Sequence, residues 1–392
     1  MPDMNIQEVS PDRDPSSNIK VVRAIVTAAS ALFCLMLLAV FCYNFMLSSG
    51  TKVSAAKVKA ADVTIMDKYD MFVTNEISDA LAGVLAIEKS YWLSDYDQVA
   101  PEPNPAGYGY VTTYEELLPI LEQAADLIDG QPLAITPDRP IWEYTGIHYY
   151  YDETILVITW KEIVSNSAYT VSEVKIAHPS QFRRFLAGGE FGSDKQFVTT
   201  AMAASVNAVM ASSGDFYGYR KLGAVVYEGE LRRFEGEVVD TCFINDDGDL
   251  LFAYRGDLKS EEEAKKFVED NDVRFSLAFG PVLLDNGEMK VPDDYPLGQI
   301  NGTYSRAALC QWDNLHYLVV NSSKEGSLIE RHTVKFFTEF IRDLGCKTAY
   351  ALDGGQTTAI VMNDELVTRP DYGTQRRISD IIYFATALPD GG

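Results

Sequence analysis

The chain has 392 residues, of which 47% are hydrophobic, and it carries a formal net charge of −24 at pH 7. This length and hydrophobic content allow a sizeable buried core and exclude a disordered polymer. The negative charge argues against nucleic-acid binding, because a surface that follows phosphates needs a positive field. For the same reason, any anionic substrate has to be captured by a local group of cationic side chains.

The N-terminal part contains an uninterrupted apolar segment. No charged residue occurs from Ala24 to Leu47, and about 24 residues at about 1.5 Å each exceed the roughly 30 Å hydrocarbon core of a bilayer. We therefore predict a single transmembrane helix at residues 21–47, preceded by a disordered tail at residues 1–20. A cleaved signal peptide is the alternative, with Ser48-Ser49-Gly50 as its candidate cleavage site. Basic residues flank both ends of the segment, so charge alone does not decide its orientation.

The next part, residues 48–140, is predicted to be a helical stalk or juxtamembrane region. Apolar residues recur every three or four positions from Ile65 to Leu85, which is typical of a helix. The absence of a clean heptad pattern argues against a coiled coil. A proline-rich stretch at 101–107 interrupts regular structure. A further helix is predicted at 113–127, where Thr113 and Glu116 form a capping-box pattern.

From about residue 141 the pattern changes to short strands with helical segments between them. The mixture does not alternate regularly, so it predicts an α+β domain with mixed or antiparallel sheets at residues 141–392. Asn245 to Asp249 resembles the start of a calcium loop, but the closing Glu is absent, and we predict a hairpin turn there. The predicted strands are 154–160, 168–176, 223–227, 238–244, 250–254, 274–279, 316–321 and 348–352, and the predicted helices are 180–186, 197–210, 260–271 and 332–344.

Cysteine and histidine spacing indicates no metal site and no cofactor. Cys242, Cys310 and Cys346 follow the apolar segment, so at most one disulfide can form among them. No Cys-x-x-Cys pair occurs, and the four histidines are scattered along the chain. A zinc site of ordinary spacing is therefore not expected.

The most informative stretch is Tyr350-Ala-Leu-Asp-Gly-Gly-Gln-Thr-Thr-Ala-Ile-Val-Met. A buried strand is predicted to end at Asp353, followed by Gly354-Gly355 and by the hydroxyls of Thr357 and Thr358. Adjacent glycines allow a left-handed backbone and the close approach of another group. A carboxylate beside bare backbone amides and two hydroxyls can hold a polar ligand. The alternative is a two-glycine hairpin turn with a solvated aspartate.

This stretch resembles the Leu-Asp-Gly-Gly-Gly-Ser-Thr signature of the phosphodiester glycosidase family. The chain departs from the signature at Gln356, where a third Gly is usual, and at Thr357, where Ser is usual. Other segments resemble the family in the same order between about Ser205 and Phe384. They are Ser213-Gly-Asp-Phe-Tyr, Phe275-Ser-Leu-Ala-Phe-Gly-Pro-Val-Leu-Leu, Tyr304-Ser-Arg-Ala-Ala and Gln375-Arg-Arg-Ile-Ser-Asp.

The resemblance implies roles for particular residues. Asp353, Asp215 and Arg306 would be catalytic, the arginine by holding a phosphate through a bidentate contact. From the residues alone, Asp215 could equally cap a turn, and Arg306 could form a surface ion pair. Either Arg376 or Arg377 would supply a second cation, and Tyr217 or Tyr219 would stack on a sugar ring. The expected substrate-binding residues are Gly354, Gly355, Thr357, Thr358, Gly214, Tyr217, Arg376 and Arg377.

The expected activity is hydrolysis of the glycosidic C–O bond in a sugar-1-phosphate diester of a glycan or cell-envelope polymer. The resemblance also implies a single-pass protein of the cell membrane, with its catalytic domain outside the cytoplasm. A different class, a non-catalytic module that binds anionic cell-surface polysaccharide, is the first alternative, and Gln356 and Ser213 favour it. A structural or assembly protein whose stalk is the functional part is the second. An Asp353→Asn variant separates these classes.

Overall fold

The computed structural model describes residues 99–236, 238–325 and 332–388, all of which fall within one unit of the chain. The predicted tail, the predicted transmembrane helix and residues 48–98 of the predicted stalk lie outside the described residues. Within the described residues, none of the helices has both the length and the apolar character needed to cross a membrane.

The domain is built on a nine-stranded sheet, which we call the large sheet, with the strand order β1-β2-β3-β4-β15-β14-β16-β12-β13. Every neighbouring pair in it is antiparallel. Its strands are β1 (Tyr108–Val111), β2 (Ile147–Asp152), β3 (Ile155–Val164), β4 (Ser167–Ile176), β12 (Val282–Asp285), β13 (Glu288–Met289), β14 (Arg306–Asp313), β15 (His316–Ser323) and β16 (Thr348–Leu352).

Three smaller antiparallel sheets complete the strand structure of the described residues. The five-stranded sheet has the order β18-β17-β6-β19-β5, the three-stranded sheet β10-β9-β11, and β7 pairs with β8. Their strands are β5 (Phe182–Leu186), β6 (Met210–Ser213), β7 (Gly223–Tyr227), β8 (Glu230–Glu235), β9 (Thr241–Asn245), β10 (Leu250–Ala253), β11 (Val273–Leu277), β17 (Ile360–Met362), β18 (Glu365–Leu366) and β19 (Asp380–Phe384).

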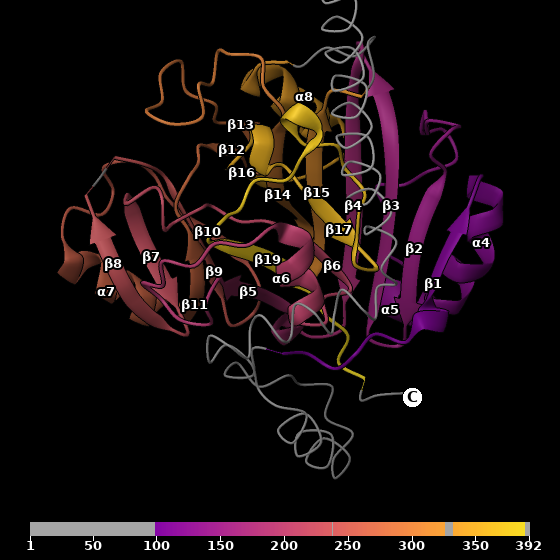
Figure 1. Cartoon of the computed structure of the whole chain (residues 1–392), viewed down its shortest axis with the longest axis horizontal. Helices are drawn as coiled ribbons and strands as arrows, with labels where there is room; N and C mark the ends of the chain where they lie inside the picture. Colours follow the sequence, from indigo (N-terminus) through magenta and orange to yellow (C-terminus); the bar gives the residue numbers. More distant parts are fainter. Residues whose placement is uncertain (1–98, 237, 326–331, 389–392) are drawn as a thin grey trace, which may run out of the picture. The chain divides into compact units, whose positions relative to one another are not determined.

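The large sheet is covered on both faces (Figure 1). One face packs against the helices α4 (Tyr114–Gln123), α5 (Ala125–Ile128) and α8 (Val334–Asp343). The other face packs against the five-stranded and three-stranded sheets. Helix α6 (Thr199–Ser205) covers the far side of the five-stranded sheet, and α7 (Glu261–Asp270) packs beside β8. Burial on both faces explains why β4 and β15 contain no exposed residue.

The longer helices begin at side-chain caps that are visible in the sequence. The hydroxyl oxygens of Thr113, Ser260 and Thr333 accept hydrogen bonds from backbone amides three residues later, at the starts of α4, α7 and α8. Such caps satisfy amides that lack a partner in the first turn of a helix, and each contributes about 1 kcal/mol. At α4, the Glu116 carboxylate also accepts from the Thr112 amide at 2.7 Å.

The structure confirms the α+β class and corrects several predicted elements. Residues 180–186 are not a helix: only Pro179–Gln181 forms a short 3₁₀ turn, and β5 follows it because its backbone pairs with β19. The predicted helix 197–210 is shorter, since Met210 already begins β6. Asn245 to Asp249 forms the predicted hairpin turn, in which the Asn245 side chain accepts from the Asp249 amide at 2.7 Å.

Residues 99–140 pack with the domain and do not form a separate stalk. Strand β1 pairs with β2 at the edge of the large sheet, and Leu117 of α4 is completely buried in the core. The folded unit therefore includes described residues on the N-terminal side of the predicted boundary at 141.

Candidate active site

Asp353 lies directly after the last residue of β16, a strand in the interior of the large sheet. Its side chain is only about 5% exposed, and its backbone amide donates to the Gly214 carbonyl at 3.4 Å. The chain does not return as a hairpin, because β16 belongs to the large sheet and β17 to the five-stranded sheet. The alternative of a hairpin turn with a solvated aspartate is therefore excluded.

The two glycines after Asp353 are required by the close approach of another strand. The amide of Gly355 donates to the Ser305 carbonyl at 2.8 Å, and a Cβ on Gly354 would lie 2.5 Å from the same oxygen. Gly355 has a φ of +69°, which side chains rarely allow. The turn thus fixes Asp353 against the start of β14.

Two arginines lie beside the Asp353 carboxylate. Nη2 of Arg220 donates to Oδ1 of Asp353 at 3.2 Å, and Arg376 acts on the carboxylate electrostatically. Burial raises the pKa of Asp353 above its ordinary value, while Arg220, Arg376 and the Thr357 hydroxyl act in the opposite direction. Asp353 is therefore a desolvated carboxyl group whose pKa lies above the ordinary value, although adjacent cations partly offset the effect of burial.

Arg220 is the residue of this site that sequence reasoning missed. It follows Asp215 by five residues, and a turn in which its amide donates to the Phe216 carbonyl at 3.1 Å brings it back toward Asp353. Its guanidinium carbon lies 5.1 Å from the Phe279 ring centroid. Its Nε is buried without a hydrogen-bond partner among the described residues. Nothing in the local sequence marks this arginine, because only the tertiary fold gives it Asp353 as a partner.

A pocket of about 290 Å³ opens beside Asp353. Arg306 also has an Nε that is buried without a partner in the described part of the chain, so two guanidinium N–H groups beside this pocket lack an acceptor. A buried donor without an acceptor is costly, and the two guanidinium groups place positive charge beside the pocket. The polar and aromatic residues that line the pocket are Arg220, Phe279, Gln299, Tyr304, Ser305, Arg306, Phe337 and Asp353, and Gly354 and Gly355 also border it.

Arg306 does not have the free guanidinium that the sequence analysis assigned to it. Nη1 donates to the Gly298 carbonyl, and Nη2 donates to the carbonyls of Gln299, at 3.0 Å, and Gly302. Burial lowers the pKa of Arg306 to about 10. Because both terminal nitrogens are bound to the loop at 298–302, the expected bidentate contact with a phosphate is not available in this arrangement.

Asp215 lies behind the site in a buried ionic network. Its Oδ1 contacts Arg184 Nη2 at 2.7 Å and accepts from the Tyr217 amide at 2.9 Å, and its Oδ2 accepts from the Ala278 amide at 2.6 Å. Arg184 also pairs with Asp380 at 2.9 Å, and all three side chains are fully buried. Burial and the Asp215 charge raise the pKa of Asp380 to about 7.

Gly214 and Phe216 show why this network matters for the site. A Cβ on Gly214 would collide with the Asp380 carboxylate, so only glycine fits there. Phe216 has a φ of +57°, which is uncommon for an aromatic residue, and its amide donates to Oδ1 of Asp380 at 2.8 Å. The network thus holds the turn that carries Arg220.

We expect Asp215→Asn to reduce the free energy of unfolding by about 1–3 kcal/mol, because an amide nitrogen would have to face a buried N–H donor. Urea unfolding followed by circular dichroism measures this change. Asp247→Asn, in an exposed turn, is the control. Unchanged stability combined with lost activity would instead support a direct catalytic role for Asp215.

Exposure separates the two tyrosines proposed for sugar stacking, and contacts separate the two arginines proposed as the second cation. Tyr217 is only about 2% exposed and stacks on Phe191, so it is placed in the core, whereas Tyr219 is 62% exposed. The guanidinium of Arg376 lies 5.4 Å from the centroid of the Tyr219 ring and influences Asp353. Arg377 is exposed. Arg376 is therefore the member of the pair that faces the site.

The remaining motif residues shape the turn. The hydroxyls of Thr357 and Thr358 lie 2.7 and 2.8 Å from the carbonyls of Gly354 and Gly355, so each has an acceptor within the turn, and the Thr357 hydroxyl also acts on the Asp353 carboxylate. The backbone carbonyl of Gln356, the residue that replaces the third glycine, accepts from the Arg376 amide at 3.3 Å. Its side-chain amide donates to the Thr374 hydroxyl at 3.1 Å. This departure from the signature tethers the segment that carries Arg376.

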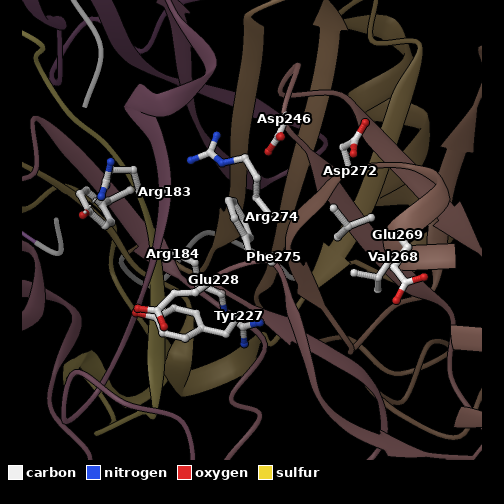
Figure 2. A pocket seen from close by; sticks show the side chains of 13 residues that line it. Arg183, Arg184, Tyr227, Glu228, Asp246, Val268, Glu269, Asp272, Arg274 and Phe275 are labelled. Atoms are coloured by element: carbon white, nitrogen blue, oxygen red, sulfur yellow. Dashed lines mark hydrogen bonds between the residues drawn. The ribbon is translucent and has the colours of Figure 1, made fainter. Parts of the chain in front are cut away.

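A second pocket of about 300 Å³ contains none of the predicted site residues (Figure 2). Asp246, Asp272 and Glu269 lie on one side of it and Arg183 on the other. Its arginines bind protein groups: Arg274 donates to the Pro179 carbonyl at 2.8 Å, and Arg183 to the Tyr383 hydroxyl at 3.0 Å. Within the described residues, no group of three or more His, Cys, Asp and Glu side chains is arranged to hold a metal ion.

Comparison with solved structures finds similar chains at low identity. The auto-inhibited catalytic domain of zebrafish N-acetylglucosamine-1-phosphodiester alpha-N-acetylglucosaminidase shares 17% identity, with a TM-score of 0.48 over 59% of this chain and 82% of that chain. A hypothetical protein from Synechocystis shares 16% identity, with a TM-score of 0.47 over 63% of this chain and 64% of that chain. No curated protein matches the sequence.

A buried carboxylate beside two arginines at a pocket wall makes this region the candidate active site of the described residues. Residues 205–385 match the model of the family described as phosphodiester glycosidase. This segment belongs to the phosphodiester glycosidase family, as the motifs indicated, and the chain is a glycosidase-type enzyme. The match includes every residue predicted for the site.

Proposed function

We propose that the enzyme hydrolyses the glycosidic C–O bond of a sugar-1-phosphate diester, with Asp353 acting at the anomeric carbon. The observation that carries this proposal is the buried Asp353 carboxylate, held 3.2 Å from Arg220 at the wall of the pocket. The family model supports the reaction class, and the zebrafish enzyme is named for the same kind of bond.

The chemistry of the leaving group fits this arrangement. A phosphate leaves with its charge already stabilised, so little protonation of the leaving oxygen is needed. The main requirement is a set of fixed cations where negative charge develops. Arg220 and Arg376 would provide them.

Asp353 has the properties needed for its part in the reaction. As a carboxylate it would attack the anomeric carbon or take a proton from the attacking water. Low exposure removes competing solvent from its oxygens, which strengthens its interaction with a developing positive charge on the sugar. Tyr219, which is 62% exposed, is the ring available for stacking on that sugar.

We also propose that the chain is anchored in the cell membrane, with the enzyme domain outside the cytoplasm and a glycan or cell-envelope polymer as substrate. The uncharged segment from Ala24 to Leu47 supports the anchor. Protease added to intact cells would digest the domain in this orientation. A domain that is degraded only after the cells are lysed would contradict it.

The reaction is tested with N-acetylglucosamine-1-phospho-methyl diester and the full-length protein in water enriched in heavy oxygen. Cleavage of the C–O bond releases unlabelled methyl phosphate and places the label on the sugar. Phosphorus NMR distinguishes this result from P–O cleavage, which places the label on the phosphate. Labelled phosphate, or no hydrolysis of this diester and of its galacto and manno counterparts, would overturn the proposal.

A further inference from the structure

A third pocket, of about 570 Å³, lies beside the large sheet, and most of its lining residues precede the segment that matches the family model. It is bounded by β1, β2, β3 and the hairpin that joins β17 to β18. We call it the tyrosine groove, and the aromatic residues that line it are Tyr108, Tyr110, Tyr144, His148, Tyr149 and Trp160. Nothing in the motif analysis assigned a function to this region.

Two rings of the tyrosine groove are open to solvent. Tyr144 is 81% exposed and Tyr110 is 51% exposed. Glycines make room for the rings beside the backbone: a Cβ on Gly146 would collide with Tyr110, and a Cβ on Gly109 would collide with Tyr149. Flat aromatic faces presented to solvent in this way match the apolar faces of sugar rings.

The polar groups of the groove suit an uncharged ligand. Lys161 is neutralised by Glu325, with Nζ 2.7 Å from Oε1. Burial, followed by the charge of Lys161, lowers the pKa of His148, so its imidazole is neutral near pH 7 and can both donate and accept hydrogen bonds. The exposed Asn363 adds a neutral hydrogen-bonding group, and the exposed Glu365 adds a carboxylate that accepts from hydroxyls and repels a phosphate, whereas the Thr159 hydroxyl is buried and bonds to Ser172. Sugar hydroxyls need such groups, whereas a phosphate would need an unpaired cation.

The groove and Asp353 lie at the same end of the large sheet. Leu352 is the residue before Asp353, and the register connects it through Ala307, Asn321 and Thr170 to Lys161. Leu352 and Lys161 are thus four strands apart across the sheet, and at about 4.8 Å per strand they are separated by about 19 Å. A polymeric glycan can extend over such a distance, but a monosaccharide diester cannot.

Four of the five exposed tyrosines among the described residues lie at these two places, and the fifth, Tyr372, lines neither pocket. Tyr110 and Tyr144 lie in the groove, whereas Tyr304 lines the Asp353 pocket and Tyr219 contacts Arg376. Exposed aromatic rings gathered at two places indicate binding sites more than solvated surface. Both places present rings with polar groups beside them.

We propose that the tyrosine groove binds neutral sugar rings of the glycan whose phosphodiester is cleaved at Asp353. The inference rests on the proposed function for the identity of the glycan, while binding in the groove can be tested without turnover. The groove would keep a long substrate on the enzyme, and it would not affect the cleavage of small diesters.

The test uses the full-length protein carrying Asp353→Asn, applied to a glycan array of neutral and phosphodiester-linked oligosaccharides. Tyr144→Ala is expected to weaken binding of extended glycans about tenfold, because one stacked ring is lost. Tyr144→Phe should retain binding. Leu118→Ala, at an exposed apolar position on α4, is the matched control. Because Tyr144 is 81% exposed, its truncation removes no core packing.

A second measurement separates this inference from the proposed function. With Asp353 intact, Tyr144→Ala should leave hydrolysis of the methyl diester unchanged and should raise KM for a polymer of N-acetylglucosamine 1-phosphate. If glycans bind through Tyr144 but no diester is cleaved, the proposed reaction fails and the groove remains a glycan site. If no extended glycan binds, or if Tyr144→Ala and Tyr110→Ala both bind extended glycans as tightly as the protein with Tyr144 and Tyr110 intact, the groove inference is overturned.

Discussion

Asp353→Asn will reduce kcat/KM for N-acetylglucosamine-1-phospho-methyl diester by about a thousandfold or more, because a positioned carboxylate contributes roughly that factor to catalysis. The amide cannot act as a base or as a nucleophile, yet it keeps the size of the side chain. Release of methyl phosphate, followed by phosphorus NMR, measures the loss.

The control for this variant is the folded state of the protein. Circular dichroism and a urea titration should show that Asp353→Asn folds, since its side chain sits at a pocket wall and not inside the ionic network of Asp215. Asp247→Asn should retain full activity. A folded Asp353→Asn protein with more than about a tenth of the wild-type activity would show that another group performs the chemistry.

Arg220→Gln should lower kcat/KM by about 100- to 1000-fold, the usual effect of removing one group that stabilises a transition-state charge. It should also move the acid limb of the pH–rate profile. The positive charge of Arg220 favours the ionised form of Asp353, so its removal raises the pKa of Asp353 further above the ordinary value. The active carboxylate then persists only at higher pH, and the acid limb shifts upward.

The matched control is Arg377→Gln, an exposed arginine next to the site arginine Arg376. We would measure kcat/KM for the methyl diester across the full pH range in the wild type, in Arg220→Gln and in Arg377→Gln. An acid limb that stays in place or moves to lower pH in Arg220→Gln would disprove the electrostatic link between Arg220 and Asp353. An equal loss of activity in Arg377→Gln would show that the effect is one of net charge alone.

The local features of the site were predictable because they are backbone features. Gly354 and Gly355 indicated a close approach, and the structure places the Ser305 carbonyl there. The helix cap at Thr113 was equally visible, because a cap depends on residues three positions apart. The strand that ends at Leu352 follows from its apolar run.

Side-chain partners across the fold were not predictable in the same way. Arg306 and Asp215 were both assigned to the substrate, but one binds the loop at 298–302 and the other binds Arg184. Strand β5 reads as polar because of its two arginines, and it is buried because both are paired inside the domain. No local pattern specifies which distant carbonyl or carboxylate a guanidinium will meet.

The sequence by itself determined the α+β class, the family motifs and the position of Asp353 after a buried strand, because each depends on the order and spacing of neighbouring residues. Only the tertiary structure decided that Arg220 and Arg376 accompany Asp353, that Tyr219 and not Tyr217 is exposed, and that the tyrosine groove shares a sheet end with the site. The physical reason is that charge pairing, burial and exposure depend on distances between atoms that are far apart in the chain.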